Sequence, residues 1–235
     1  MVKSRTLTES IEDRIAAVRE RMAESAVRAG REISEIRLMA VTKTRTVEEM
    51  LAAAPLVDAL GENRVQEAAS KKPDWPDSAK LEWRLIGHLQ SNKVRKALAL
   101  FDALDSLDSA GTALAAERIA AESGRVVPVL IEVNTSGESN KTGVDVGGFP
   151  ELLDRVLECS HLKLEGLMTV GPLTRDETRV RNAFARLREM ASRARLESGL
   201  PLPVLSMGMS DDFEWAILEG STCVRIGTLL FGVRA

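Results

Sequence analysis

The stretch "RLMAVTKTRTVEEMLAA", Arg37–Ala53, joins two kinds of hydrophobic pattern. Its first five residues, Arg37–Val41, form a short apolar run typical of a buried strand, and "VEEMLAA" from Val47 returns to the spacing of an amphipathic helix. Between the two lies "AVTKTR", Ala40–Arg45, where the apolar run stops at a lysine. A strand that leads directly into a helix is the repeating unit of parallel α/β folds.

The same pairing recurs along the chain. Seven further runs have the length and apolar content of strands: Val57–Leu60, Glu82–Ile86, Phe101–Leu104, Val126–Val133, Leu162–Met168, Val204–Ser206 and Cys223–Ile226. Helices are expected between them over residues 65–72, 92–100, 110–122, 151–159, 175–197 and 211–218. Apolar residues at helical steps from Leu7 to Ala26, followed by Gly30, predict one more helix ahead of the first strand.

Eight strands that alternate with helices predict parallel pairing, because parallel strands need crossover connections and these are usually helices. We therefore predict an α/β fold with a single (β/α)8 TIM barrel, an extra N-terminal helix and one domain over residues 1–235. No linker rich in Pro, Gly or Ser divides the chain. A doubly wound open sheet is the alternative, because the number of strands counted from one sequence is easily wrong.

Charge and composition favour a small-molecule partner. With 32 basic and 35 acidic residues, the net charge of -3 gives no reason to expect nucleic acid or an anionic membrane surface. The two cysteines, Cys159 and Cys223, form no CxxC pair, so we expect neither a metal site nor a disulfide. The first ten residues lack the apolar core of a signal peptide, and no run is long enough to span a membrane, so we expect a cytoplasmic protein.

Chemistry in such a barrel gathers where the strands end. Lys43 directly follows the first strand, and a lysine in a partly desolvated mouth is a nucleophile toward carbonyls, although most lysines are simply solvated. "GENRVQE", Gly61–Glu67, places Asn63 at the same end, where it could also be a helix N-cap. "IGHLQSNK" contains His88, and a lone histidine is more often a structural hydrogen-bonding residue than a catalyst. "VNTSGESNKTG", Val133–Gly143, predicts a long loop on this face.

Two loops near the end of the chain predict an anion site. "LSMGMSDDFEWA" places Ser206, Gly208 and Ser210 between a strand and a helix expected to open at Asp211, so N–H groups and a hydroxyl would converge at a helix N-terminus. "VRIGTLLFG" places Gly227 and Thr228 after the eighth strand, and the loops after strands seven and eight of such barrels often bind phosphate. Either glycine could merely shape a turn. Together with Lys43 these loops predict an amine for an aldehyde and a cradle for a phosphate.

Seven motifs in order, "AVTKTR", "GENRVQE", "IGHLQSNK", "SGESNKTG", "GLMT", "LSMGMSDDFEWAI" and "STCVRIGTLLFG", resemble those of the pyridoxal phosphate homeostasis proteins, the YggS-like family. The resemblance runs from about residue 9 to residue 232 and implies a barrel of the alanine racemase N-terminal type that holds pyridoxal 5'-phosphate (PLP). The chain departs from the family pattern at Arg64, Arg84 and Gly171, none of which lies at the lysine or in the glycine loops.

The resemblance also implies roles for individual residues. Lys43 would form a Schiff base with the cofactor, Arg225 would face the pyridine nitrogen, and the role of Lys141 is not assigned. The other cofactor-binding candidates line the ring or hold the phosphate: Asn63, Met168, Ser206, Ser210, Gly227 and Thr228. A cation at the ring nitrogen disfavours its protonation and makes the cofactor a poorer electron sink.

Two functions remain in competition. The resemblance implies a non-catalytic protein that holds PLP as a Schiff base, serves PLP homeostasis and meets apo PLP-enzymes as transient clients. The alternative is a PLP-dependent amino-acid racemase, which in related two-domain enzymes uses a tyrosine from an added domain as a second acid/base; this chain contains no tyrosine. A metal-dependent barrel enzyme is disfavoured because no His, Asp or Glu cluster has ligand spacing. The residues leave the oligomeric state open, and a monomer is our expectation.

Overall fold

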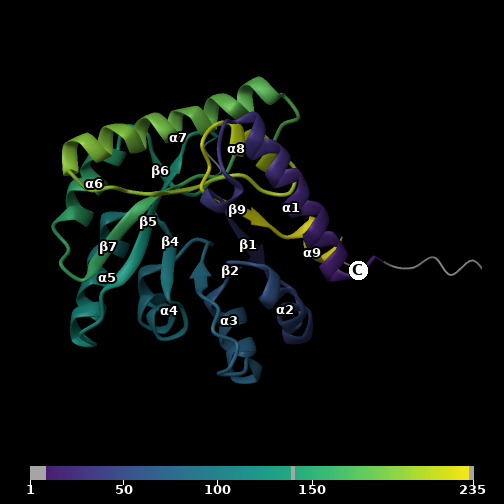
Figure 1. The fold of residues 1–235 in the computed structure, drawn as a ribbon. Helices are drawn as coiled ribbons and strands as arrows, with labels where there is room; N and C mark the ends of the chain where they lie inside the picture. Colours follow the sequence, from purple (N-terminus) through teal and green to yellow (C-terminus); the bar gives the residue numbers. More distant parts are fainter. Residues whose placement is uncertain (1–8, 139–140, 233–235) are drawn as a thin grey trace, which may run out of the picture.

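A computed structural model describes residues 9–138 and 141–232 of the chain (Figure 1). Eight parallel strands of this part close into a barrel. Their spatial order is β4, β3, β2, β1, β9, β8, β7 and β5, and a further pairing of β4 with β5 closes the ring. Their bounds are β1 Arg37–Val41, β2 Ala59–Glu62, β3 Trp83–Leu85, β4 Ala103–Leu107, β5 Val127–Asn134, β7 Leu162–Met168, β8 Val204–Ser206 and β9 Cys223–Ile226.

Helices surround the barrel, which confirms the (β/α)8 prediction and excludes the open sheet. They are α1 Ile11–Arg28, α2 Val47–Ala53, α3 Val65–Lys71, α4 Val94–Leu100, α5 Ala110–Glu122, α6 Phe149–Leu157, α7 Glu177–Ser198, α8 Phe213–Leu218 and α9 Thr228–Phe231. Short 3-10 turns lie at 33–35, 54–56, 72–74 and 91–93. None of the helices in the described ranges is long and apolar enough to cross a membrane.

Four strands have the predicted bounds, and the others differ for physical reasons. β2 begins later than predicted, at Ala59, because Pro55 lies in a 3-10 turn over Ala54–Leu56 and the chain becomes extended only after it. β4 continues to Leu107, beyond the predicted end at Leu104, through the buried polar residues Asp105 and Ser106. A ninth strand, β6 (Val144–Asp145), pairs with the end of β5 outside the ring and was not predicted.

Helix α1 is the predicted extra N-terminal helix. It begins at an N-cap, Ser10, whose hydroxyl accepts from the Asp13 N–H while the Asp13 carboxylate accepts from the Ser10 N–H, so both ends of this capping box are satisfied. Its buried face includes Ile15, Val18 and Met22. Figure 1 shows α1 beside α8 and α9, and an Arg21–Glu214 ion pair at 3.1 Å joins it to α8. The first helix therefore packs against the last two.

The core divides into a layer outside the strands and a barrel interior. The main apolar cluster lies between the outer faces of the strands and the helices. A smaller cluster of Met39, Ala59 and Cys223 lies inside the ring, where side chains of alternate residues point. A Cβ on Gly61 would lie 2.8 Å from the Met39 sulfur, so the Met39 side chain packs closely over the Gly61 backbone of β2. The rest of the barrel interior holds buried charged side chains.

Candidate functional site

The predicted site residues lie at the carboxyl ends of five neighbouring strands. In the ring β2, β1, β9, β8 and β7 are consecutive. Ala40 of β1 pairs with Ile226 of β9, so the turn with Lys43 and the loop with Gly227 and Thr228 continue from adjacent strands at the same level. The structure therefore brings these predicted residues together at one end of the barrel. This placement follows from the alternation of strands and helices, because the loops after all the parallel strands lie at the same end.

The flanking strands bring in the remaining predicted residues. On one side, Val41 pairs with Gly61, which puts Asn63 just beyond the end of β2. On the other, Ser206 is paired with Met168, so β8 and β7 end together. Asn63 does not cap α3, because the residue at that N-cap is Arg64. The capping alternative for Asn63 is thus wrong.

Lys43 lies in a hydrogen-bonded turn. The Arg45 N–H donates to the Thr42 carbonyl at 3.0 Å, which closes the turn around Lys43 and Thr44. Thr44 has a φ of 64°, the left-handed region that a β-branched residue rarely adopts and that costs about 1–3 kcal/mol. Lys43 itself is half-buried. The backbone around the predicted nucleophile is therefore held in an unusual shape.

The two glycine loops meet at the start of α9. The Leu229 N–H points to the Ser210 hydroxyl at 3.5 Å, which joins the loop after β8 to the loop after β9. Helix α8 begins at Phe213, two residues later than predicted, because the Asp212 carboxylate accepts from the Met209 N–H at 2.6 Å and forms a turn first. A Cβ on Gly208 would lie 2.6 Å from that of Ala216, so this glycine permits the loop to pack against α8.

Arg225 occupies the barrel interior beneath these loops. It is 3% exposed and donates to the Ser206 hydroxyl and to the Thr169 carbonyl, each at 2.8 Å. Burial lowers the pKa of Arg225 from its ordinary value, although nearby groups such as Cys223 and Asp105 oppose the shift. Ser206 is fully buried and faces Arg225, so the structure gives its hydroxyl a role in orienting the guanidinium.

Further charged side chains fill the interior, and the sequence patterns did not predict them. Arg84 donates to Asp105 at 2.8 Å and to Glu82 at 2.6 Å. Burial alone would lower the pKa of Arg84, but the carboxylates of Asp105 and Glu82 outweigh it and raise the pKa. Barrels of this type are usually filled by branched apolar side chains. The charged interior departs from that pattern and lies beneath the carboxyl-terminal loops.

Glu132 on β5 is a second interior carboxyl group. It is 3% exposed, and one of its oxygens accepts from the Thr142 hydroxyl at 2.6 Å, which ties the loop after β5 to the barrel. Its other oxygen, Oε2, is buried without a hydrogen-bond partner. Burial raises the pKa of Glu132 above 4.5, and the Thr142 hydrogen bond offsets this only in part. The ionised form of Glu132 is therefore disfavoured in the folded protein.

The Glu132→Gln variant is expected to be more stable than the wild type at a pH where Glu132 would be ionised, because the buried carboxylate destabilises the folded protein. Since the folded pKa lies above the unfolded value of 4.5, the stability associated with Glu132 is fully present below that value and is lost as the pH rises through the folded pKa. A neutral amide does not titrate, so the variant should have the higher melting temperature at about pH 8 and lose this advantage near about pH 4. Thermal unfolding at both pH values measures it. The exposed Glu151→Gln is the matched control, and an equal gain at both pH values would contradict the assignment.

Other predicted residues of this face have defined partners. His88 Nδ1 lies 2.8 Å from an oxygen of Asp108, and the His88 side chain is half exposed. Lys141 donates to the Gly171 carbonyl and lies 2.6 Å from Glu138.

Two cavities lie at opposite ends of the barrel, one of about 470 Å³ and one of about 810 Å³. The larger cavity lies at the carboxyl ends of β7 and β8 and is lined by Lys141 among other residues.

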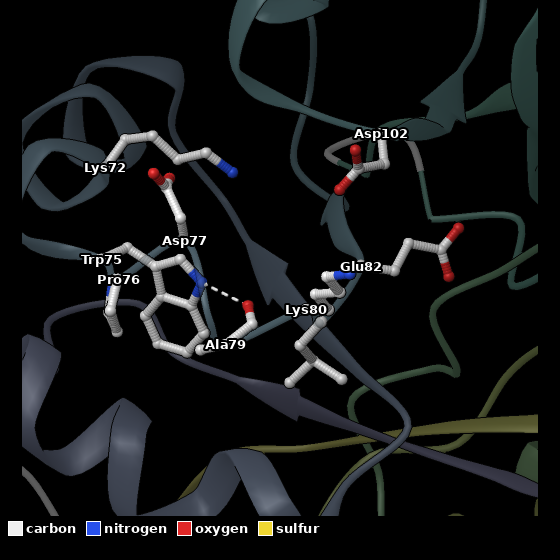
Figure 2. Close-up of a pocket in the computed structure, with 9 residues that line it drawn as sticks. Lys72, Trp75, Pro76, Asp77, Ala79, Lys80, Glu82 and Asp102 are labelled. Carbon is white, nitrogen blue, oxygen red and sulfur yellow. Dashed lines mark hydrogen bonds between the residues drawn. The ribbon is translucent and has the colours of Figure 1, made fainter.

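The smaller cavity lies at the amino ends of β3 and β4, away from Lys43. Figure 2 shows Lys72, Glu82 and Asp102 around it, with the Trp75 indole N–H donating to the Ala79 carbonyl at 2.9 Å. Burial lowers the pKa of Lys72, and Asp102 opposes the shift. In the described ranges no group of three His, Cys, Asp or Glu side chains could hold a metal ion.

The model of the family described as "Alanine racemase, N-terminal domain" matches residues 14–235. Alanine racemase from Clostridium difficile has a TM-score of 0.72 at 16% identity, with 94% of this chain and 57% of that chain covered. At this identity the likeness shows the fold alone. By fold and by the position of its site, this is a (β/α)8 barrel of the alanine racemase N-terminal type.

Closer relatives share nearly the full length. The pyridoxal phosphate homeostasis protein of Aquifex aeolicus is 41% identical over 225 residues, covering 94% of this chain and 97% of the relative. That of Escherichia coli K12 is 38% identical over 231 residues, covering 94% and 95%. PipY of Synechococcus elongatus, solved with PLP bound, has a TM-score of 0.82 at 33% identity and covers 95% of this chain and all of that one. The chain belongs to the pyridoxal phosphate homeostasis protein family.

Proposed function

We propose that this protein binds PLP in the mouth of its barrel, holds it covalently through Lys43 and serves PLP homeostasis without catalysing a reaction. One observation carries the proposal: an amine on the β1 turn lies at the same end of the barrel as the hydroxyl and N–H donors that meet at the start of α9. PLP carries an aldehyde, which suits the amine, and a phosphate, which suits the hydroxyl and N–H donors. The PLP-bound structure of PipY supports it.

The residues present fit a phosphate at this point. The first N–H groups of a helix have no partner within the helix, and they attract anions. At the start of α9 these N–H groups lie beside the hydroxyl of Ser210, and Thr228 adds a second, exposed hydroxyl. A Cβ on Gly227 would lie 3.4 Å from Val41, so β1 and the loop are packed closely here. We assign Ser210, Gly227 and Thr228 to the phosphate.

Residues in the interior of the barrel would contact the pyridine ring of PLP. Arg225 is held from two sides, by Ser206 and by the Thr169 carbonyl, so its guanidinium is fixed in place. We assign Arg225 to the pyridine nitrogen, with Asn63 and Met168 lining the ring and Ser206 acting through Arg225. A fixed cation there disfavours a proton on that nitrogen and so weakens electron withdrawal by the ring. This arrangement argues against a transaminase, which needs the ring as a strong electron sink.

Bound PLP supplies an electrophilic aldehyde carbon, with which the Lys43 amine forms a C=N bond while the carbonyl oxygen leaves as water. For that step the amine must be unprotonated and directed into the mouth. The fixed turn around Lys43 serves the second requirement.

A racemase requires a second acid/base on the opposite face of its substrate. The sequence given contains no tyrosine, and nothing in the motif that contains His88 requires this residue to act as the second base. We therefore propose that turnover of amino acids is absent. The single-domain organisation over residues 1–235, a monomeric state and transient transfer of PLP to apo-enzymes are further parts of the proposal. A reducing, cytoplasmic location is supported by the two buried, unpaired thiols of Cys159 and Cys223.

Adding PLP to the purified protein is expected to produce a visible absorption band that borohydride removes, with the label on Lys43. Incubating the PLP-bound protein with L- or D-alanine in deuterated water should then give no exchange at Cα above the rate with free PLP, as measured by proton NMR. Binding without exchange supports the carrier. Stereospecific exchange that the Lys43→Ala variant lacks would instead establish a racemase.

A further inference from the structure

Lys43 is flanked by two peptide groups, and side chains from β2 and α3 hold both. The Thr42 carbonyl, which precedes Lys43, accepts from the Lys71 ammonium at 2.7 Å as well as from the Arg45 N–H. The Thr44 N–H, which follows Lys43, donates to the Glu67 carboxylate. The backbone on each side of the lysine is thus tied to a charged side chain of α3.

These charged side chains are joined to one another. The Lys71 ammonium lies 2.6 Å from Glu62 and 2.7 Å from Glu67, so it links the two carboxylates. Glu62 also accepts from the Thr42 hydroxyl at 2.7 Å. We call Glu62, Glu67 and Lys71 the turn clamp. Its members bind the turn at the residue before Lys43 and at the residue after it.

The clamp is buried, which separates it from an ordinary surface ion pair. Glu62 is fully buried and Lys71 is 8% exposed, and burial raises the pKa of Glu62 despite the Lys71 and Thr42 hydrogen bonds. The turn that it holds contains Thr44 with its left-handed backbone. Buried ion pairs are weak contributors to stability, and strained residues persist where the surroundings impose them, commonly at functional sites.

We propose that Glu67 and Lys71 are positioning residues that aim Lys43 at the bound aldehyde. This inference rests on the proposed function, because it assigns how the same lysine reaches its partner. Neither residue touches the ligand in this scheme. They act by fixing the peptide groups on either side of Lys43, so that the amine reaches the mouth from one backbone geometry. Misplacing a reacting group by about 1 Å can slow a reaction by about 100-fold.

The test compares covalent linkage with non-covalent binding in one set of variants. Glu67→Ala removes the acceptor of the Thr44 N–H, and because Glu67 is only partly buried and the Glu62–Lys71 pair stays intact, the fold should survive. The rate of linkage at Lys43 is followed by borohydride trapping and mass spectrometry. Pyridoxine 5'-phosphate, which has the ring and phosphate but no aldehyde, reports the pocket without the covalent bond.

Glu67→Ala is expected to slow the linkage by about 10-fold or more while the affinity for pyridoxine 5'-phosphate stays near the wild-type value. Glu67→Gln keeps an oxygen acceptor and should restore much of the rate. Gln66→Ala, an exposed neighbour on the same helix, is the matched control and should behave as the wild type. The variant Glu62→Gln/Lys71→Met removes both buried charges together and should slow the linkage in the same way.

Two results would overturn the inference in folded variants, as judged by circular dichroism. One is an unchanged linkage rate in both Glu67→Ala and the double variant. The other is a parallel loss of pyridoxine 5'-phosphate affinity, which would show a general structural role. Failure of the proposed function has a different signature: the wild-type protein itself would form no linkage at Lys43, and the positioning role would fall with it.

Discussion

The Lys43→Ala variant is expected to lose all covalent labelling when it is mixed with PLP and reduced with borohydride. The methyl group that remains has no nitrogen to bond the aldehyde carbon, whereas the donors at Ser210 and at the start of α9 are untouched. Non-covalent binding should therefore persist with an affinity lower by about 100-fold or more, since loss of the bond forfeits several kcal/mol. Peptide mapping by mass spectrometry and a binding titration measure the two effects.

Lys80→Ala is the matched control for this experiment. Lys80 is an exposed lysine at the other end of the barrel, beside the smaller cavity, and its loss should leave the label in place. Lys43→Ala should change the free energy of unfolding by only about 0.5 kcal/mol, as is usual for partly exposed positions. A label that moves to another lysine and keeps its full yield in Lys43→Ala would contradict the assignment of the anchor.

The Gly166→Ala variant is expected to lose about 3 kcal/mol or more of stability, and with it the site. A Cβ on Gly166 would lie 1.9 Å from the Val204 carbonyl oxygen, a backbone atom of the neighbouring strand that cannot turn away. Gly166 pairs with Val204 of β8, and the pairing of β7 with β5 on its other side is irregular at Glu165. β7 and β8 must therefore separate to admit the methyl group.

Separating β7 from β8 would also displace Arg225, because the two groups that hold its guanidinium lie at the ends of these two strands. Thr169 follows β7 and Ser206 ends β8, and both hold the guanidinium. Chemical denaturation gives the change in stability, and PLP titration at low temperature gives the change in binding. Gly124→Ala is the control: its φ of 62° also disfavours alanine, but a Cβ there meets nothing within 4 Å, so the cost should be about 1–2 kcal/mol. Equal losses in the two variants would show that backbone conformation, and not the strand contact, sets the effect.

The barrel could be predicted from the sequence because its strands leave a strong pattern. Outer-facing side chains of a parallel sheet covered by helices are apolar, and the runs at Arg37–Val41 and Leu162–Met168 were correct to the residue. The end of β4 was missed because Asp105 and Ser106 are polar although buried, and a polar pair after an apolar run resembles the start of a loop. Closure itself follows from the β4–β5 pairing, which no single run encodes.

The site could be predicted only in part. The meeting of Lys43 with the two glycine loops at one end of the barrel could be predicted, because each lies just past the end of a strand and the strand register brings those ends together. The turn clamp was missed, because Glu67 and Lys71 lie in a predicted helix, where charged residues usually face solvent. One signal was available, since residues 67 and 71 are four apart and thus lie on one face of a helix.

The packing of α1 against α8 and α9 has a consequence for the order of events in the cell. A ribosome makes the chain from its first residue, so α1 emerges when residues 213–231, which cover it, are still unmade. Those late residues include α8 and α9, beside which lie the groups that we assign to the phosphate. The proposed site therefore cannot form before residues 213–231 have been synthesised, long after α1 has emerged.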